Sequence, residues 1–338
     1  MEIGANLLRS GKADLNNVLF VTEKFCDAKP ELGWTNSFHN LFATFSKTQP
    51  DYKFNTLHLD EAALIFGRNI DKVLLEYCDK FKVDIFIFCL LGDSPLNPTK
   101  ATLQALKDKG KYVCVIWPDT GPGWGMKTIQ ELGDAVNLNV SIDFPIGHHV
   151  DHTKLHRNHL FLWTPEDDSL YYPQENKDID ISFVGTKNYI DRSAFLNRLK
   201  SDFPNMYIGG GQREEKLSPE QYASIIRRSK IGINFSLSAT LAFYQLKGRT
   251  LEHLASKTLL IENLNPSTEH FFKNGYDYVA FNSYDELVNK IKYYLSNPIE
   301  LNKIAEHGYK TFQEKCTAKL FWDSVMLRIE VYRKQKHD

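Results

Sequence analysis

The sequence has few cysteines, no long hydrophobic run and almost no net charge. Its five cysteines include no CxxC pair, and Cys89 and Cys114 lie in apolar runs, so we interpret them as buried residues in a reducing compartment. The longest apolar run, at residues 85–91, is too short to span a bilayer, and no targeting segment is visible. We therefore expect a cytoplasmic protein without a transmembrane segment. The net charge of -1 argues against a broad electrostatic interaction with nucleic acid or an anionic membrane.

The chain does have the length and composition of a globular protein with roughly two domains. It has 338 residues, of which 42% are hydrophobic and 25% charged. Short β-branched or aromatic runs alternate with amphipathic stretches. Strands are predicted at residues 18–22, 54–59, 83–90, 112–117, 138–142, 179–184, 206–209, 231–235, 258–261 and 278–281. Helices are predicted at residues 36–46, 70–81, 99–109, 191–200, 219–228, 244–255, 284–296, 298–314 and 319–334.

This alternation predicts an α/β protein with two doubly wound, Rossmann-like parallel-sheet domains that face a central cleft. The stretch WTPEDDSLYYPQENKDID is acidic, contains two prolines and has no helical period, so it is interpreted as a connection between the domains. The predicted division is a first domain at 1–165, a linker at 166–178, a second domain at 179–315 and a C-terminal helix at 316–338 that packs toward the first domain. Ligands of such sheets bind at the carboxyl ends of the strands, so the loops that follow strands matter most.

Two glycine-containing loops of the second half follow predicted strands. Gly185, Thr186 and Lys187 come after the first of these strands, with Arg192 shortly beyond. The glycine permits a close backbone approach and the two cations suit a diphosphate, although a tight turn before a solvated helix fits equally well. The run that contains Gly210 and Gly211 indicates either a close neighbour or a flexible loop.

A third loop carries more of the argument. Ser236 and Ser238 precede a predicted helix, and small hydroxyl residues before a helix N-terminus form a natural phosphate site. Gln245, Arg249 and Glu252 are spaced at i, i+4 and i+7 and are predicted to share one face of that helix. A carboxylate there is able to accept two hydrogen bonds from a ribose diol, whereas the alternative is an exposed Arg–Glu pair.

This part of the sequence resembles a known family. The stretch QLKGRTLEHLASKTLLIENLNPSTEHFFKNGYDYVAFNSYDELVNKIKYYLSNPIELNKIAEHG is similar to the C-terminal domain of GT-B glycosyltransferases. The preceding DISFVGT and SPEQYASIIRRSKIGINFS share the resemblance, which extends over residues 179–322. The pattern is closest to the retaining E-x7-E type, in the group 1 or spore-maturation-type glycosyltransferase-like subgroup.

The resemblance implies a glycosyltransferase that moves a sugar from a UDP- or GDP-sugar to a hydroxyl acceptor such as a glycan. It implies retention, no metal and no tightly bound cofactor, with the acceptor in the first domain and the nucleotide-sugar donor in the second. Glu252 matches the second glutamate of E-x7-E, which holds the donor ribose, and Gln245 stands in place of the first glutamate as a candidate catalytic residue. Lys187 and Arg192 resemble the basic pair that neutralises the diphosphate. The other expected donor contacts are Gly185, Thr186, Gly210, Gly211, Ser236, Ser238, Gly248 and Arg249.

Three alternatives stay open at this point. A nucleotide-sugar epimerase uses the same fold and would convert a donor without an acceptor. A non-catalytic carbohydrate-binding or assembly protein is compatible with an uncharged Gln245. A DNA-modifying role is conceivable for this fold, but the near-neutral charge disfavours it.

The first half offers candidate acceptor residues in two loops. Gly33 and Trp34 follow the first predicted strand, and Trp117, Thr120 and Trp124 belong to the Gly/Pro-rich loop after residues 112–117. The indoles could stack on a sugar ring or belong to the core. Asp119 in the same loop is a candidate catalytic base or acceptor-orienting group, or otherwise a helix cap.

A histidine cluster lies between the two halves: His148, His149, His152, His156 and His159. The i+3 and i+4 spacings suit a zinc site, but no HExxH motif is present. Surface histidines, or one that contacts the donor, fit the sequence better, so no metal is expected.

Overall fold

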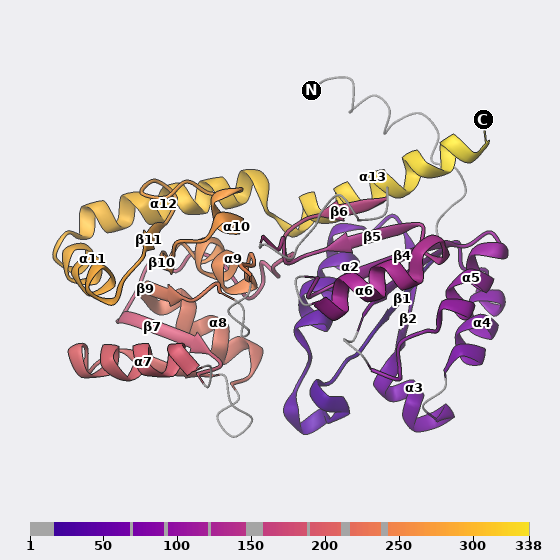
Figure 1. Ribbon diagram of the computed structural model, residues 1–338, viewed down its shortest axis with the longest axis horizontal. Coiled ribbons are helices and arrows are strands. Elements are labelled where there is room, and N and C mark those ends of the chain that lie inside the picture. Colours follow the sequence, from indigo (N-terminus) through magenta and orange to yellow (C-terminus); the bar gives the residue numbers. More distant parts are fainter. Residues whose placement is uncertain are drawn as a thin grey trace.

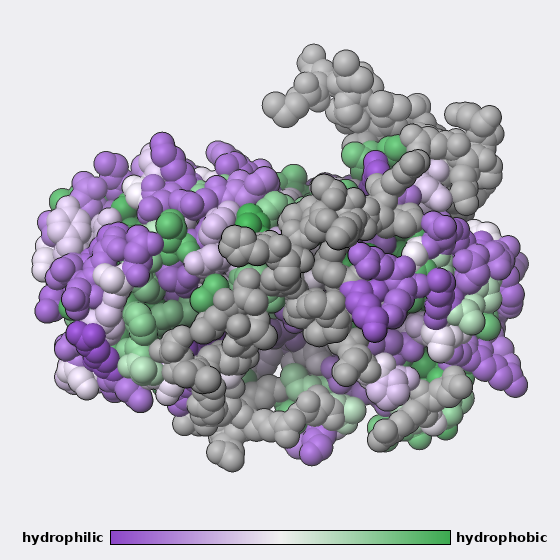
Figure 2. Space-filling view, viewed as in Figure 1, coloured by the Kyte–Doolittle hydropathy of each residue, from purple (hydrophilic) through white to green (hydrophobic). Residues whose placement is uncertain are grey.

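The computed structural model describes residues 17–67, 70–90, 94–120, 123–146, 158–187, 190–210, 217–237 and 243–337. Two α/β domains lie side by side, each built on one parallel sheet, with the first domain on the right of Figure 1 and the second on the left. This architecture confirms the predicted pair of doubly wound domains. Figure 2 shows that hydrophilic residues dominate the outer end of the second domain on this face.

The first sheet has six strands in the order β2-β1-β3-β4-β5-β6. They are β1 (Asn17–Thr22), β2 (Lys53–His58), β3 (Ile85–Cys89), β4 (Tyr112–Trp117), β5 (Leu138–Ser141) and β6 (His159–Phe161). The helical elements are η1 (Cys26–Ala28), η2 (Pro30–Leu32), η3 (Ser37–Ala43), α2 (Thr44–Thr48), α3 (Leu59–Phe66), α4 (Asp71–Lys80), α5 (Lys100–Asp108), α6 (Gly123–Leu132) and η4 (Gly133–Ala135). The strand order reverses between β1 and β3, which is where such sheets bind ligands.

The second sheet has five strands in the order β11-β10-β9-β7-β8. They are β7 (Ile179–Gly185), β8 (Tyr207–Gly210), β9 (Ser229–Asn234), β10 (Leu259–Asn263) and β11 (Val279–Phe281). The helices are α7 (Ile190–Asp202), α8 (Pro219–Arg228), α9 (Gly248–Ala255), α10 (Pro266–Glu269), α11 (Tyr284–Ser296), α12 (Pro298–Lys315) and α13 (Ala318–His337). Here the order reverses between β7 and β9, so three of the loops that the sequence singled out, those after β1, β7 and β9, lie at the reversal points.

One predicted helix begins later than expected. The prediction placed its start at residue 244, but α9 begins at Gly248. Tyr244 instead pairs with Ile146 in an antiparallel bridge, in which each backbone N–H donates to the other residue's carbonyl at 2.9 and 3.0 Å. Gln245 therefore precedes the helix and does not share a helical face with Arg249 and Glu252. The expectation of one common face was wrong for Gln245.

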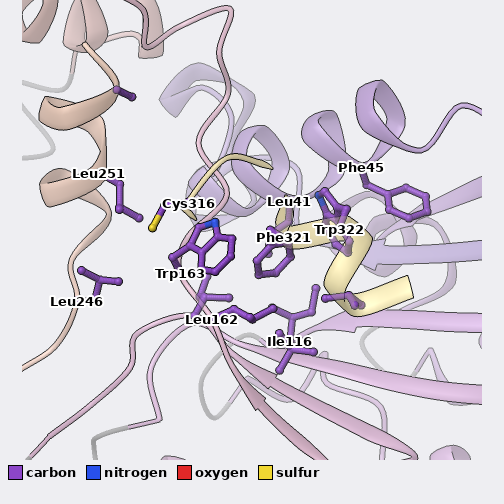
Figure 3. Packing of buried hydrophobic residues seen from close by; sticks show 14 of the residues in the cluster. Leu41, Phe45, Ile116, Leu162, Trp163, Leu246, Leu251, Cys316, Phe321 and Trp322 are labelled. Carbon is purple, nitrogen blue, oxygen red and sulfur yellow. The ribbon is translucent and has the colours of Figure 1, made fainter. Parts of the chain in front are cut away.

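The last helix crosses from the second domain to the first. Trp322 on α13 lies against Phe45 with ring centroids 5.0 Å apart, and its indole N–H donates to Thr44 Oγ1 at 2.9 Å. Figure 3 shows Trp163 between Cys316 and Leu251 on one side and Phe321 on the other, so a single apolar cluster joins the domains. Burying these large rings stabilises the junction through the hydrophobic effect.

The segment predicted as a linker is attached to the second domain. Arg227 donates to the Leu170 carbonyl at 2.5 Å, and Lys177 donates to the Arg227 carbonyl at 2.8 Å and to Thr258 Oγ1 at 2.9 Å. Arg228 forms an ion pair with Asp178. These contacts order the connection against α8, while the boundaries at 165 and 178 stay predictions.

Within the described residues, no helix is both long and apolar enough to cross a membrane.

Candidate functional site

A cavity of about 520 Å³ lies between the two domains. The first domain contributes η3 and the loops after β1, β4 and β5. The second contributes the loops after β7 and β9 and the helices α7, α8 and α9, and one further residue comes from the connection. The lining residues are Asn36, Ser37, Asn40, Leu41, Pro118, Asp119, Ile142, Thr164, Thr186, Arg192, Tyr222, Phe235, Leu237, Phe243, Gln245, Lys247, Gly248, Arg249 and Glu252. The cavity therefore occupies the place where doubly wound sheets bind ligands.

Two arginines contribute positive charge to the second-domain wall. Arg249 donates to Asn234 Oδ1 at 2.9 Å and lies over the Phe183 ring, 5.0 Å from its centroid. Arg192 donates to the Thr186 carbonyl at 3.0 Å, and its guanidinium is 5.7 Å from the Phe235 centroid. Hydrogen bonds and aromatic faces hold both guanidinium groups in place at the cavity, which suits them to an anionic ligand.

Gly185 makes the position of Arg249 possible. A Cβ added at Gly185 would lie 1.9 Å from Arg249 Nη2, and the φ of +143° is one that side-chain-bearing residues rarely adopt. Gly185 does permit a close approach, as expected, but the group that approaches it is the guanidinium of Arg249. Gly185 does not line the cavity itself, but it leaves the room that Arg249 needs to line it.

Glu252 lies on the same wall and is 6% exposed. Its Oε2 accepts a hydrogen bond from the Tyr222 hydroxyl at 3.0 Å, and Tyr171 donates to the same carboxylate. Burial raises the pKa of Glu252, while Arg249 and the two tyrosine hydroxyls oppose that shift. The carboxylate is thereby fixed in orientation at the edge of the cavity.

A second acid, Glu166, lies behind the cavity wall. A Cβ added at Gly248 would be 3.3 Å from Glu166 Oε1 and 3.8 Å from Glu252 Oε1, so the missing side chain of Gly248 leaves room for both acids. Burial, followed by the charge of Glu252, raises the pKa of Glu166 well above its ordinary range, and Asn40 opposes this. We therefore expect Glu166 to be the protonated member of the pair near neutral pH.

Gln245 connects the two walls. Its side-chain amide donates to Asp119 Oδ1 at 3.0 Å and to Asp143 Oδ2 at 3.1 Å, and its Oε1 accepts from Lys247. Asp143 also accepts hydrogen bonds from the backbone and hydroxyl of Thr120, at 2.7 and 2.5 Å. Burial raises the pKa of Asp143 to about 6. Gln245 thus links the second domain to two carboxylates of the first.

Gln245 does not occupy the position of the first motif glutamate. The first glutamate of E-x7-E stands eight residues before the second, and that position is Tyr244, whereas Gln245 is seven residues before Glu252. The backbone of Tyr244 bridges to Ile146. The chain therefore has neither a glutamate nor a glutamine at the expected spacing.

Several predicted site residues do not line the cavity. Trp117 is fully buried in the first domain, where its indole donates to Asn139 at 2.9 Å, so the structure gives it a core position. Thr120 is also fully buried. The backbone N–H of Ser236 donates a hydrogen bond to Asn263 Oδ1 at 2.8 Å. Trp34 is 46% exposed and packs against Phe38 and His39. Gly33, Lys187 and Gly210 are likewise absent from the lining residues that the structure describes.

Some predictions fall outside the described residues. Gly211, Ser238, the side chain of Trp124, and four of the clustered histidines lie there, namely His148, His149, His152 and His156. The fifth histidine, His159, lies in β6 with its Nε2 2.5 Å from Ser141 Oγ. In the described part of the chain, no group of three or more His, Cys, Asp or Glu side chains is arranged to hold a metal ion.

The sequence prediction missed other residues of the site. Asn36, Asn40, Tyr222 and Lys247 line the cavity, and Tyr171 and Glu166 support it. Asn36 and Asn40 were predictable as site residues, because they are polar and follow the first strand, where loops of parallel sheets border ligand sites. The positions of Tyr171 and Glu166 depend on how the connection folds over α8 and α9, which local spacing does not reveal.

Comparisons with known proteins match part of the chain to a family model and the whole chain to a known fold. The family model described as "Glycosyl transferase-like" matches residues 175–325, a segment that includes α8, α9 and the second-domain wall of the cavity. No curated protein matches the chain.

Solved structures resemble the whole chain in fold. HepE (Alr3699) of Anabaena, in complex with UDP and glucose, is 8% identical with a TM-score of 0.60. The match covers 96% of this chain and 100% of the HepE chain. Sucrose-phosphate synthase of Thermosynechococcus elongatus is 10% identical with a TM-score of 0.62 and covers 95% and 100%. An alpha-glucosyltransferase in complex with UDP-glucose and DNA containing an abasic site is 12% identical with a TM-score of 0.60 and covers 93% and 99%. The chain therefore has the GT-B fold, which its sequence resemblance implied.

Proposed function

We propose that this chain is a glycosyltransferase that moves a sugar from a UDP- or GDP-sugar to a hydroxyl acceptor such as a glycan. The observation that carries the proposal is the cavity shared by both domains, with Arg192, Arg249 and Glu252 on its second-domain wall. That wall belongs to the segment matched by the glycosyl transferase-like family model. Structural neighbours that bind UDP or UDP-glucose support the same donor class.

In the proposed complex the donor lies on the second-domain wall. Arg192 and Arg249 face the diphosphate, and the N-terminus of α9 adds its positive end. The Lys247 side chain, which precedes α9, bonds to Gln245 instead of capping the helix. Glu252, held by Tyr222, accepts the ribose hydroxyls. These charges would stabilise the departing diphosphate without a metal ion.

The acceptor approaches from the first domain in this proposal. Asp119 is exposed at the cavity, and its Oδ1 is held by Gln245. A carboxylate fixed in this way is suited to orient an acceptor hydroxyl or to take its proton. Asn36 and Ser37 line the same side and add hydrogen-bonding groups for a sugar.

Retention of anomeric configuration is part of the proposal. It is supported by the sequence resemblance and by a neighbour described as an alpha-glucosyltransferase that binds UDP-glucose. An alpha product from that alpha-linked donor corresponds to retention. The proton NMR coupling constant of the anomeric proton in the first-formed product would distinguish retention from inversion.

The proposed ribose contact predicts the behaviour of Glu252→Gln. Because the variant loses a charged acceptor, we expect donor binding to weaken by about 1.5 kcal/mol. Thermal shift with UDP-, GDP-, ADP- and CMP-sugars identifies the donor, and calorimetry then measures its affinity for both proteins. Glu314→Gln, a change at an exposed acid on α12, is the matched control and should bind like the wild type.

The same measurements separate the alternatives. If no nucleotide sugar shifts the melting temperature of the wild type, the proposal is wrong. A donor that is isomerised in the absence of any acceptor would identify an epimerase. A donor that binds but is neither transferred nor hydrolysed with a panel of glycan acceptors would indicate a binding protein.

A further inference from the structure

Behind the cationic wall lies a carboxylate with no role in the proposed ligand contacts. Glu262 on β10 is fully buried. It accepts hydrogen bonds from Thr250 Oγ1 at 3.0 Å, from Asn265 Nδ2 at 3.1 Å and from Thr268 Oγ1 at 3.3 Å. Burial of a charge is costly, and these neutral donors offset part of that cost.

One branch of this network leads to Arg249. Thr250 has a single hydroxyl proton, and when Glu262 accepts it, Thr250 Oγ1 is left as an acceptor. It accepts from Asn234 Nδ2 at 3.1 Å, which turns Asn234 Oδ1 toward the Arg249 guanidinium at 2.9 Å. The negative charge of Glu262 at one end and the donor-only Arg249 guanidinium at the other thereby fix the direction of every hydrogen bond in this branch.

A second branch leads to Gln245. Asn265 Nδ2 donates both to Glu262 Oε1 and to the backbone carbonyl of Gln245, the latter at 2.9 Å. The side chain of Gln245 contacts the first domain through Asp119 and Asp143. One buried acid is thus connected to the proposed diphosphate contact and to the contact between the domains.

We infer that Glu262 is a positioning residue of the proposed donor site, one that orients Arg249 toward the diphosphate and Gln245 toward the first domain. This inference rests on the proposed function. Glu262 acts through other side chains, because it is fully buried and is not among the residues that line the cavity.

The network responds to protonation of Glu262. Burial raises the pKa of Glu262 to about 7, against the opposing hydrogen bonds from Asn265, Thr250, Ser236 and Thr268. Arg249 on α9 and Tyr278 before β11 also interact electrostatically with it. Below pH 7 the Glu262 carboxylate gains a proton and no longer requires a hydrogen bond from Thr250. The Thr250 hydroxyl is then free to rotate, and the hydrogen bonds that lead to Arg249 are no longer held in one arrangement. Donor affinity should therefore fall as the pH falls through about 7.

Calorimetric titration with UDP-glucose tests this inference between about pH 6 and pH 8.5. A nucleotide sugar has no secondary phosphate ionisation in this range, so changes with pH report on the protein. For Glu262→Gln we expect about tenfold weaker binding than wild type at pH 8, as for the loss of one charge-assisted hydrogen bond, and little change with pH. Glu269→Gln alters an exposed acid on α10 and should reproduce the wild-type curve.

The outcomes are distinct. A folded Glu262→Gln protein with wild-type affinity and wild-type pH dependence would overturn the inference. If that variant does not fold, Thr250→Val decides, because it cuts the branch to Arg249 and leaves the Asn265 branch intact. Wild-type affinity and pH dependence in Thr250→Val would then overturn the inference. Failure of the wild type to bind any nucleotide sugar would instead refute the proposed function itself.

Discussion

At the scale of single residues, four of the carboxylates near the cavity differ in how deeply they are buried and in which charged groups lie beside them. Asp119 is exposed, whereas burial raises the pKa of Asp143 to about 6 and that of Glu262 to about 7. Burial also raises the pKa of Glu252, but Arg249 opposes it. The acid with the freest access to solvent is therefore the one proposed to contact the acceptor. Of the buried acids, Glu252 and Glu262 belong to the second domain, whereas Asp143 holds Gln245 at the junction between the domains.

The contact between Gly185 and Arg249 yields a prediction at this scale. Gly185→Ala places a methyl group where Arg249 Nη2 now lies and imposes a φ of +143° on an L-residue. We expect the guanidinium to be displaced and donor affinity to fall about tenfold, since a charge-assisted contact is lost. Calorimetry with the donor measures the change.

Gly110→Ala is the matched control for that substitution. Gly110 also has a positive φ, +77°, but a Cβ there would meet nothing within 4 Å. The control should lose stability by about 1 kcal/mol through backbone strain and keep its donor affinity. Equal losses of donor affinity in both variants would show that strain, not displacement of Arg249, is the cause.

Sequence reasoning found those residues of the second-domain wall whose positions follow from local spacing. Arg249 and Glu252 are three apart on a helix, so their common face was predictable. Tyr171 was not predictable in the same way, because its contact with Glu252 depends on the connection lying over α8 and α9. Trp117 was predicted as an acceptor residue but is fully buried in the core. An indole at the end of a buried strand fits a core position as readily as a sugar site, and the sequence does not distinguish the two.

At the scale of elements, local signals explain which bounds were predictable. Helix α8 begins at Pro219 as predicted, because Ser218 is its N-cap and forms a capping box with Gln221. Helix α3 was missed, because its start at Leu59 directly follows β2 and reads as more of the strand. The start of α9 was misplaced because the bridge between Tyr244 and Ile146 is a tertiary contact. Local propensity does not encode such a contact.

Helix α13 gives the prediction at this scale. Trp322 is fully buried against the first domain, so Trp322→Ala should lower the free energy of unfolding by about 3–5 kcal/mol. Trp322→Phe keeps most of the packing and loses the hydrogen bond to Thr44, so a loss of about 1 kcal/mol is expected. Urea unfolding measures both changes.

The control for α13 is Leu327→Ala. Leu327 is 46% exposed on the same helix and should tolerate the change with a small loss. If Trp322→Ala were no more destabilising than Leu327→Ala, the helix would not be holding the first domain.

At the scale of the whole molecule, several contacts join the domains, and one of them, the side chain of Gln245, also lines the cavity. The bridge between Ile146 and Tyr244, the apolar cluster around Trp163 and the side chain of Gln245 all cross the junction. One structural neighbour was solved with DNA, but the net charge of -1 gives this chain no overall attraction for a polyanion. A change at the junction should therefore alter both stability and transfer.

Gln245→Glu tests this coupling. The variant replaces an amide that donates to Asp119 and Asp143 with a third carboxylate, so repulsion should lower the free energy of unfolding by about 2–4 kcal/mol at pH 8. Near pH 5.5 the loss should be smaller, because Asp143, with its pKa of about 6, gains a proton and donates to the new carboxylate. Urea unfolding at both pH values measures this, with Gln130→Glu at an exposed position of α6 as the control. Sugar transfer should fall in parallel. A rise in transfer would instead mean that position 245 does take the role of the first motif glutamate.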